Sequence, residues 1–412
     1  MGLLAAASGF SGTNQSILLM IKYINQTKIS NKRVLLRVDF NVSLSKDGLR
    51  IADDARIRQV LPTIEYLLKN KNKLILISHL GRPKKRDPRF SLKVVANRLS
   101  RFLPKYKVKL ISDFQNPADQ QILAKQSENE VFLLENIRFY PEEKKNCNKL
   151  AKELSQWADV FVNDAFGVSH RVSASVVCLP KYLPSYAGLL LKKEIAMIDK
   201  LIKHPKKPVV AIIGGAKVNT KMQILSKLCY LADYLLVGGG LANTILAAKG
   251  YEMGKSRFDY EDLEKAQQLL FLADLKKAKI ILPADAIVGL PDVEDEAGEV
   301  RSITDLPLNK YALDIGPATQ ALFGNYISKA GTIIWNGPMG YFENPLFRNG
   351  TDFIFYAITQ NKQADSLVGG GDTIVAISKK EYLDKITHLS TGGGAMLEYI
   401  EKGTLPGIEA LK

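Results

Sequence analysis

The stretch Leu367-Val368-Gly369-Gly370-Gly371-Asp372-Thr373 runs from apolar residues into a glycine triplet and then into residues that suit the start of a helix. The chain repeats this arrangement at Gly238-Gly239-Gly240 and at Gly392-Gly393-Gly394. Glycine permits a sharp turn and a close approach of N–H groups to a ligand, and a helix N-terminus adds partial positive charge. One triplet alone equally suits a tight strand-to-helix turn, but three together predict a site for a phosphate-bearing ligand.

Short apolar runs alternate with helical patterns along the rest of the chain, as expected for buried parallel strands with helical crossovers. Six runs lead directly into polar or glycine residues, at 34–38, 74–77, 131–134, 160–162, 209–213 and 332–335. The pattern predicts an α/β fold of two Rossmann-like, three-layer αβα domains, joined by a helix and separated by a cleft. Ligands of such sheets bind beyond the carboxyl ends of the strands, so the strand-end residues are the candidate site.

The domain boundary is predicted where the chemistry of the strand ends changes. Strand ends of the first half carry Asp, Asn, His and Arg, whereas those of the second half carry Gly, Lys and Asp. Between the halves lies an apolar stripe at helical spacing, formed by Leu191, Ile195, Ile198 and Ile202. We predict domains over residues 1–190 and 191–395, with residues 396–412 returning to the first domain. Residues 1–19 lack the basic start of a secretory signal and are interpreted as an extension.

Composition narrows the classes of protein that remain. The formal net charge is +15, which suits nucleic acid, anionic surfaces or acidic small substrates. The lysines are scattered, and no apolar run is long enough to span a bilayer, so neither a nucleic-acid nor a membrane partner is predicted. Cys147, Cys178 and Cys229 form no CxxC pair. So sparse a set favours a reducing compartment, and we predict a cytoplasmic protein.

Two other classes of protein would carry different sequence motifs from those found here. A dinucleotide-dependent dehydrogenase should carry G-x-G-x-x-G in its first strand-to-helix turn, but that turn here is Asp39-Phe40-Asn41. A basic nucleic-acid-binding protein should show clustered Lys and Arg with interleaved aromatic residues, and the chain shows neither.

The order of the strand-end motifs resembles that of the phosphoglycerate kinase family. The resemblance extends from about Ser30 to about Gly407. The matching segments are Arg37-Val38-Asp39-Phe40-Asn41, Ser78-His79-Leu80-Gly81-Arg82-Pro83, Glu135-Asn136-Ile137-Arg138, Asn163-Asp164-Ala165-Phe166-Gly167 with His170-Arg171, Gly214-Gly215-Ala216-Lys217-Val218, Trp335-Asn336-Gly337-Pro338, Gly369-Gly370-Gly371-Asp372-Thr373 and Ser390-Thr391-Gly392-Gly393-Gly394-Ala395.

The resemblance implies a monomeric kinase that moves a phosphoryl group reversibly between 1,3-bisphosphoglycerate and ADP, giving 3-phosphoglycerate and ATP, with Mg²⁺. The acceptor carboxylate is already ionised at neutral pH, so catalysis needs positioning and charge stabilisation rather than a general base. Because the two substrate sites fall on separate predicted domains, we also predict hinge closure at residues 187–202 and near Gly392, with Arg56 and Lys217 too far apart in the unliganded protein to touch one phosphoryl group.

On the glycerate side, the resemblance implies a basic patch whose arginine forks bind phosphate. Arg56 is further expected to reach the transferring group. Taken alone, Arg56 and Arg138 equally suit surface ion pairs. The implied substrate-binding residues are Asp39, Phe40, Asn41, Arg56, His79, Leu80, Gly81, Arg82, Arg138 and Arg171.

On the nucleotide side, Asp372 is expected to hold Mg²⁺ and to cap the following helix, and Thr373 to cap the same helix while contacting the phosphates. Glu343 is implied to bind the ribose. The implied nucleotide-binding residues are Gly214, Lys217, Lys221, Gly238, Asn336, Glu343, Gly370, Gly371, Asp372 and Thr373. The implied catalytic residues are Arg56, Lys217, Gly371 and Gly394.

Four positions depart from the family pattern, at Ser43, Ser173, Ala312 and Met339. None removes a charge assigned to catalysis. Ser173 is expected to weaken a contact on the substrate side. Ala312 and Met339 leave the choice of nucleotide base open.

Overall fold

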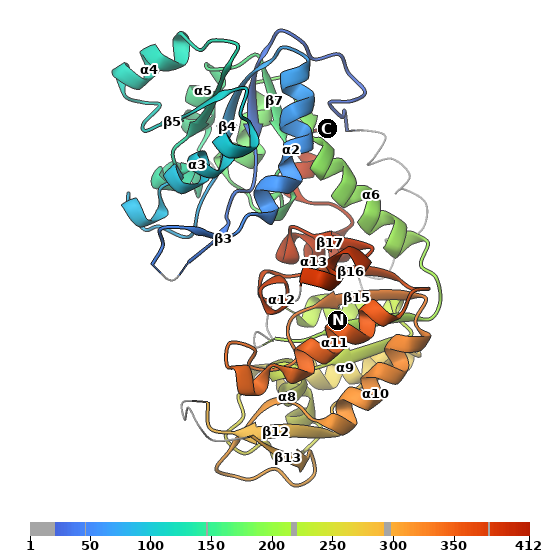
Figure 1. Ribbon diagram of the computed structural model, residues 1–412. Helices are drawn as coiled ribbons and strands as arrows, with labels where there is room; N and C mark the ends of the chain where they lie inside the picture. The colour runs from blue at the N-terminus through green and yellow to red at the C-terminus, as the bar shows by residue number, and fades with distance from the viewer. Residues whose placement is uncertain (1–20, 46, 146, 216–220, 292–297, 378–379) are drawn as a thin grey trace. The chain divides into compact units, whose positions relative to one another are not determined.

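The computed structural model describes residues 21–45, 47–145, 147–215, 221–291, 298–377 and 380–412. The chain divides into two compact units, Met1–Ala196 with Lys402–Lys412, and Met197–Glu401. Each unit contains a six-stranded parallel sheet flanked by helices (Figure 1). The predicted two-domain α/β fold with Rossmann-like sheets is therefore confirmed. The extension predicted over residues 1–19 lies outside the described residues.

The sheet of the first unit has the strand order β5-β6-β4-β1-β7-β8. Its central strand β1 pairs with β4 on one side and β7 on the other, which places Leu35 opposite both Ile75 and Phe161. All three side chains are fully buried, as expected where helices cover both faces of a parallel sheet. The elements are β1 Arg33–Arg37, β4 Lys73–Ile77, β5 Lys107–Ile111, β6 Glu130–Leu134, β7 Val160–Asn163, β8 Ser185–Ala187, α2 Ala55–Lys69, α3 Lys93–Phe102, α4 Pro117–Ala124 and α5 Asn148–Ser155.

The sheet of the second unit has the order β11-β10-β9-β15-β16-β17. Its elements are β9 Val209–Ile213, β10 Tyr234–Val237, β11 Lys279–Ile281, β15 Thr332–Asn336, β16 Asp365–Gly369, β17 His388–Ser390, α7 Met222–Leu231, α8 Gly239–Ala248, α9 Leu263–Leu275, α10 Pro317–Lys329, α11 Asn349–Gln360, α12 Gly371–Ala376 and α13 Gly393–Lys402. Each glycine triplet leads into a helix, α8, α12 or α13, as predicted.

Two small antiparallel sheets were not anticipated from the sequence. One has the order β13-β12-β14 and belongs to the second unit, and the other is a pair of short strands, β2 and β3, in the first. Their bounds are β2 Ser43–Leu44, β3 Ile51–Asp53, β12 Asp285–Gly289, β13 Glu299–Ser302 and β14 Tyr311–Ile315. Such short strands carry little periodic signal.

Helix α6 (Leu189–Lys203) takes the chain from the first unit into the second. Its predicted apolar stripe is confirmed, because Leu191, Ile195, Ile198 and Ile202 are all buried. The C-terminal residues, with the short helix α14 (Pro406–Glu409), pack in the first unit. There Gly407 N donates to Ser169 O at 2.8 Å.

Candidate functional site

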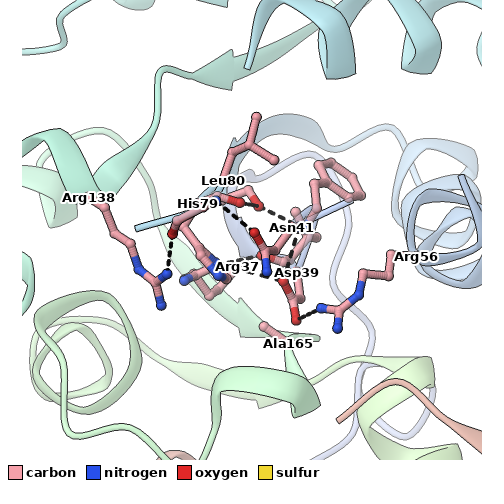
Figure 2. A network of polar contacts seen from close by, with 12 residues as sticks. Arg37, Asp39, Asn41, Arg56, His79, Leu80, Arg138 and Ala165 are labelled. Carbon is pink, nitrogen blue, oxygen red and sulfur yellow. Dashed lines mark hydrogen bonds and ion pairs between the residues drawn. The ribbon is translucent and has the colours of Figure 1, made fainter. Parts of the chain in front are cut away.

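Four loops of the first unit meet beyond the carboxyl edge of its sheet (Figure 2). Strands β1, β4, β6 and β7 lie side by side and are parallel, so the residues that follow all four strands lie at the same edge of the sheet. Asp39 and Asn41 follow β1, His79 follows β4, and Arg138 follows β6. The fold therefore brings together side chains that lie up to about a hundred residues apart in sequence.

Asp39 lies at the centre of this cluster and is almost completely buried. It forms an ion pair with Arg56, and its Oδ1 lies 3.8 Å from His79 Nδ1. Burial alone opposes ionisation of this carboxyl, but the guanidinium groups of Arg56 and Arg37 outweigh it and hold the pKa of Asp39 well below its usual range. Asp39 is therefore a permanently ionised hydrogen-bond acceptor with Arg56 beside it.

Asn41 and Arg138 both bind the backbone at Gly81. Asn41 Oδ1 accepts from Gly81 N at 2.7 Å, and Arg138 donates to Gly81 O. Gly81 has φ of 61°, and a Cβ there would overlap the ring of Phe90, so a side chain is excluded on both grounds. This glycine turn aligns the loops that carry the two side chains.

His79 is buried, and its surroundings decide its charge. Burial lowers the pKa of His79 well below its ordinary value, and Arg138, Arg37 and Arg56 add to this against the opposing effect of Asp39. The imidazole is therefore neutral near pH 7 and supplies a hydrogen-bonding group to the basic patch rather than a positive charge.

The positive charge of the patch comes from its arginines. Burial, and after it Arg171 and Arg37, lowers the pKa of Arg138 to about 10, so its guanidinium remains charged at neutral pH. Within the part of the chain that the structure describes, no carboxylate forms an ion pair with Arg138, Arg171 or the exposed Arg82. Such unpaired guanidinium groups at a sheet edge suit a phosphate-bearing anion.

The second unit builds its sheet edge mainly from backbone groups. Gly214 N donates to Asn336 O, and Gly238 N donates to Ile213 O, both at 3.0 Å. Asn336 Nδ2 donates to Gly369 O at 2.8 Å. These bonds join the ends of β9, β10, β15 and β16 into one surface.

Glycine is required where the loops after β16 and β17 touch. Gly370 has φ of 123°, and a Cβ at Gly393 would overlap Gly370 Cα. At Gly371 the situation is reversed, because a Cβ there would meet no atom within 4 Å. The exposed N-terminus of α12 thus has open space beside it, which leaves room for a ligand.

The predicted caps of α12 are wrong. Its N-cap residue is Gly370, which makes no side-chain cap bond, and Asp372 lies exposed in the first turn. The Thr373 hydroxyl instead accepts from Gly337 N at 2.7 Å. The positive φ of Gly370 turns the chain two residues before the predicted cap at Asp372, and the Thr373 hydroxyl binds the loop after β15 instead.

Lys221 is the cation that the structure describes at this edge, where it donates to Gly214 O. Burial lowers the pKa of Lys221 to about 8, and Asp372 opposes this shift. Lys217 lies outside the described residues. Gly394 is exposed in the first turn of α13. Glu343 is also exposed, and no described residue forms a hydrogen bond or ion pair with its side chain.

Two of the departures from the family pattern pack inside the second unit. Met339 is buried and fills the space beside Gly238, where a Cβ would lie 2.6 Å from its sulfur. Ala312 N donates to Ser256 Oγ at 2.8 Å in the antiparallel sheet.

The sequence predicted no role for Arg37 or Asp314, two buried charged residues. Each lies two positions from a residue with a predicted role or departure, Asp39 and Ala312 respectively. Arg37 ends β1 and is buried, with Nε donating to Ser175 Oγ at 2.9 Å. Asp314 is buried at the end of β14, and burial raises its pKa to about 7. It accepts from Gly350 N at 2.7 Å. A charged residue ending an apolar strand was the available signal in both cases.

These features define a two-domain α/β protein with an arginine cluster at one sheet edge and glycine-rich turns at the other. The chain belongs to the phosphoglycerate kinase family, whose model, described as "Phosphoglycerate kinase", matches residues 24–403. It is similar to the phosphoglycerate kinases of Koribacter versatilis (46% identical over 399 residues, covering 94% of this chain and 98% of that one) and Dictyoglomus turgidum (46% over 384 residues, covering 93% and 96%).

Solved structures of phosphoglycerate kinases have a similar fold. The phosphoglycerate kinase of Coxiella burnetii superposes with a TM-score of 0.81 at 38% identity, covering 95% of this chain and 98% of that one. That of Pyrococcus horikoshii has the same TM-score and coverage at 32% identity.

Proposed function

We propose that this protein catalyses reversible phosphoryl transfer from 1,3-bisphosphoglycerate to ADP, giving 3-phosphoglycerate and ATP, as a phosphotransferase with a carboxyl group as acceptor. Membership of the family supports the reaction. The observation that carries it is the set of arginines at the first sheet edge, Arg138 and Arg171 above all, which form no ion pair with a carboxylate among the described residues.

On the glycerate side, each group has a task that its environment permits. Arg138, Arg171 and Arg82 would bind the phosphate of the ligand through paired N–H donors. Asp39, which stays ionised, would accept a hydrogen bond from the glycerate hydroxyl, with Asn41 and neutral His79 beside it. Arg56 is held by Asp39 and would stabilise the transferring phosphoryl group.

On the nucleotide side, the backbone N–H groups of Gly371 and Gly394 and the ammonium group of Lys221 would bind the phosphates. By family resemblance, Lys217 would stabilise the transferring group and Glu343 would bind the ribose. The neutral, buried Met339 and the glycines at 214 and 238 would line the base side. Asn336 and Thr373 would hold these loops in place, since both bond to neighbouring loop backbone.

At this second edge, the residues present could hold Mg²⁺ through Asp372 and the phosphates of a bound nucleotide. Asp372 offers an exposed carboxylate at the start of α12, and the described residues contain no cluster of three potential metal ligands. The ion would therefore be held by Asp372 together with nucleotide phosphates, which is how Mg²⁺ is commonly bound. When bound, it would neutralise charge on the transferring phosphate.

We further propose that the first domain binds the glycerate substrates and the second binds the nucleotide, with the boundary at residue 190 and residues 396–412 serving the first domain. A cytoplasmic, monomeric protein is also proposed. Cys147 and Cys229 form no disulfide among the described residues, which suits a reducing compartment. Among the described residues, no helix is long and apolar enough to cross a membrane.

A coupled assay tests the reaction. Purified protein with 3-phosphoglycerate, ATP and Mg²⁺ should form ADP, and omission of any one component should abolish the signal. Protein that binds nucleotide but shows no turnover dependent on 3-phosphoglycerate would overturn the proposal.

A further inference from the structure

A buried network lies beside the arginine cluster. Its central residue is Glu143, which is 3% exposed and ends the short helix η3 (Pro141–Glu143). Its carboxylate accepts from Ser173 Oγ at 2.9 Å, from Ser175 Oγ at 2.7 Å and from Ser175 N at 2.9 Å. A carboxylate this deeply buried persists because its oxygens are satisfied.

The network continues from Ser175 into the sheet. Ser175 Oγ accepts from Arg37 Nε at 2.9 Å, and the Arg37 guanidinium also donates to the backbone at Val38 and Ile77. Burial lowers the pKa of Arg37, and Glu143 and then Asp39 oppose this. Glu143 thus offsets the charge of Arg37 while it binds the loop at Ser173 and Ser175.

The two loops joined by Glu143 are the loops that carry the phosphate-binding arginines. Arg138 lies in the short helix η2 (Ile137–Phe139), and hydrogen-bonded turns continue from it to Glu143. Arg171 lies two residues before Ser173, and Ser173 N donates to Arg171 O at 3.1 Å. Burial lowers the pKa of Arg138 and the charge of Arg171 lowers it further, because two like charges near one another repel. Some contact must therefore hold their loops together when no anion is bound.

We propose that Glu143 is a positioning residue that holds Arg138 and Arg171 at the spacing required for one phosphate group, acting through Ser173 and Ser175. The inference rests on the proposed function for the identity of the ligand, but the arginine spacing itself does not depend on it. Ser173 is one of the departures from the family pattern, and its hydroxyl donates a hydrogen bond to the Glu143 carboxylate.

The test compares Glu143→Gln with the matched control Glu142→Gln. Glu142 is adjacent, in the same helix, and exposed, so the control removes the same charge without touching the network. Titration calorimetry should show 3-phosphoglycerate binding weakened about ten- to hundredfold in Glu143→Gln, since small misplacements of binding groups have effects of that order. The control should match the wild type. The KM for ATP should stay unchanged in both variants.

A double-mutant cycle with Arg171→Ala separates positioning from general damage. If Glu143 acts through the arginines, adding Glu143→Gln to Arg171→Ala should weaken binding much less than Glu143→Gln does in the wild type. Fully additive losses, an equal rise in the KM for ATP, or unchanged binding by a folded Glu143→Gln protein would each overturn the proposal.

Two further measurements keep the test decisive. If Glu143→Gln does not fold, Ser173→Ala replaces it, because it removes a single bond to the same carboxylate. Binding should then weaken about threefold, the scale of one modest hydrogen bond, and unchanged binding would overturn the proposal. If the wild type shows no kinase activity, the proposed function fails separately. Inorganic phosphate then serves as the probe, and weaker phosphate binding by Glu143→Gln than by Glu142→Gln still supports the positioning role.

Discussion

The two sheet edges offer different chemical groups to an anionic ligand. The first edge uses charged side chains, and buried partners such as Asp39 and Glu143 hold these in place. The second uses backbone N–H groups beside glycines, with few side-chain charges among the described residues. The difference teaches where each site is vulnerable. Removal of a side-chain charge should impair the first edge, whereas a methyl group added at a closely packed glycine should disrupt the second.

The largest expected effect is at Arg56. Arg56→Ala should lower kcat by about two orders of magnitude with little change in the KM for ATP, because removal of one preorganised charge costs roughly 3 kcal/mol in the barrier. Steady-state kinetics with both substrates varied would measure it. Near-normal kcat would remove Arg56 from the proposed transfer step and leave it an ion-pair partner of Asp39.

At the second edge the contrast is between two neighbouring glycines. Gly393→Ala should destabilise the protein by about 1–3 kcal/mol, because its Cβ overlaps the backbone of Gly370. Gly371→Ala should leave stability unchanged, since its Cβ meets open space. Urea unfolding of both variants provides the comparison. Equal losses of stability would show that this edge is not organised by glycine packing.

A substitution at Asp372 tests the carboxylate assigned to Mg²⁺ at the nucleotide edge. Asp372→Asn should raise the Mg²⁺ concentration needed for half-maximal activity about tenfold, the effect of losing one charge-assisted contact. Thermal stability should not change, because Asp372 makes no cap bond in α12. A variant that unfolds more readily and keeps its Mg²⁺ response would identify a structural residue instead.

The two edges should also differ in their response to pH. The pKa of Lys221 in the folded protein is about 8, below its ordinary 10.5. As the pH rises, the folded protein therefore loses this proton before the unfolded chain does. Burial of the charged ammonium group lowers the free energy of unfolding by its full amount below about pH 8, and this loss of stability decreases as the pH rises toward 10.5. Under the proposed role of Lys221, the nucleotide phosphates bind its protonated form, so nucleotide affinity should fall above about pH 8.

The first edge supplies the control for this pH profile. Asp39 stays ionised, His79 stays neutral, and the pKa of Arg138 is about 10. Affinity for 3-phosphoglycerate should therefore stay level between about pH 7 and pH 9. Calorimetry of each ligand across this range measures both profiles, and Lys221→Met should abolish the slope for the nucleotide. Parallel profiles would contradict the contrast between the edges.

The smallest expected signal is a change in size. If the proposed domains bind different substrates, transfer requires the reacting atoms to come within about 3–3.5 Å, so we predict hinge closure that needs both substrates. Small-angle scattering should give a smaller radius of gyration for the ternary complex than for the free protein or either binary complex. An identical radius in all four states would argue against closure.

Much of the fold was predictable because its signals are local. Fully buried strands such as residues 209–213 are continuous apolar runs, and the glycine triplets mark the turns that follow strands. The antiparallel strands β12–β14 were missed, since strands of four or five residues have little periodicity and β13 is mostly exposed. The caps of α12 were mispredicted because Asp and Thr are usual capping residues, and only the packing against Gly337 shows what the Thr373 hydroxyl binds.

By itself, the sequence determined the two parallel sheets, the order of the strand-end motifs and the residue types at each edge, because these follow from hydrophobic pattern and turn chemistry along the chain. The tertiary structure alone decided their charge states and their support. His79 is neutral because burial, together with three arginines that are distant in sequence, outweighs Asp39. Arg138 and Arg171 are joined through Glu143 and Ser175, which lie 32 residues apart. Burial and electrostatic interaction depend on distance in space, and sequence separation does not reveal that distance.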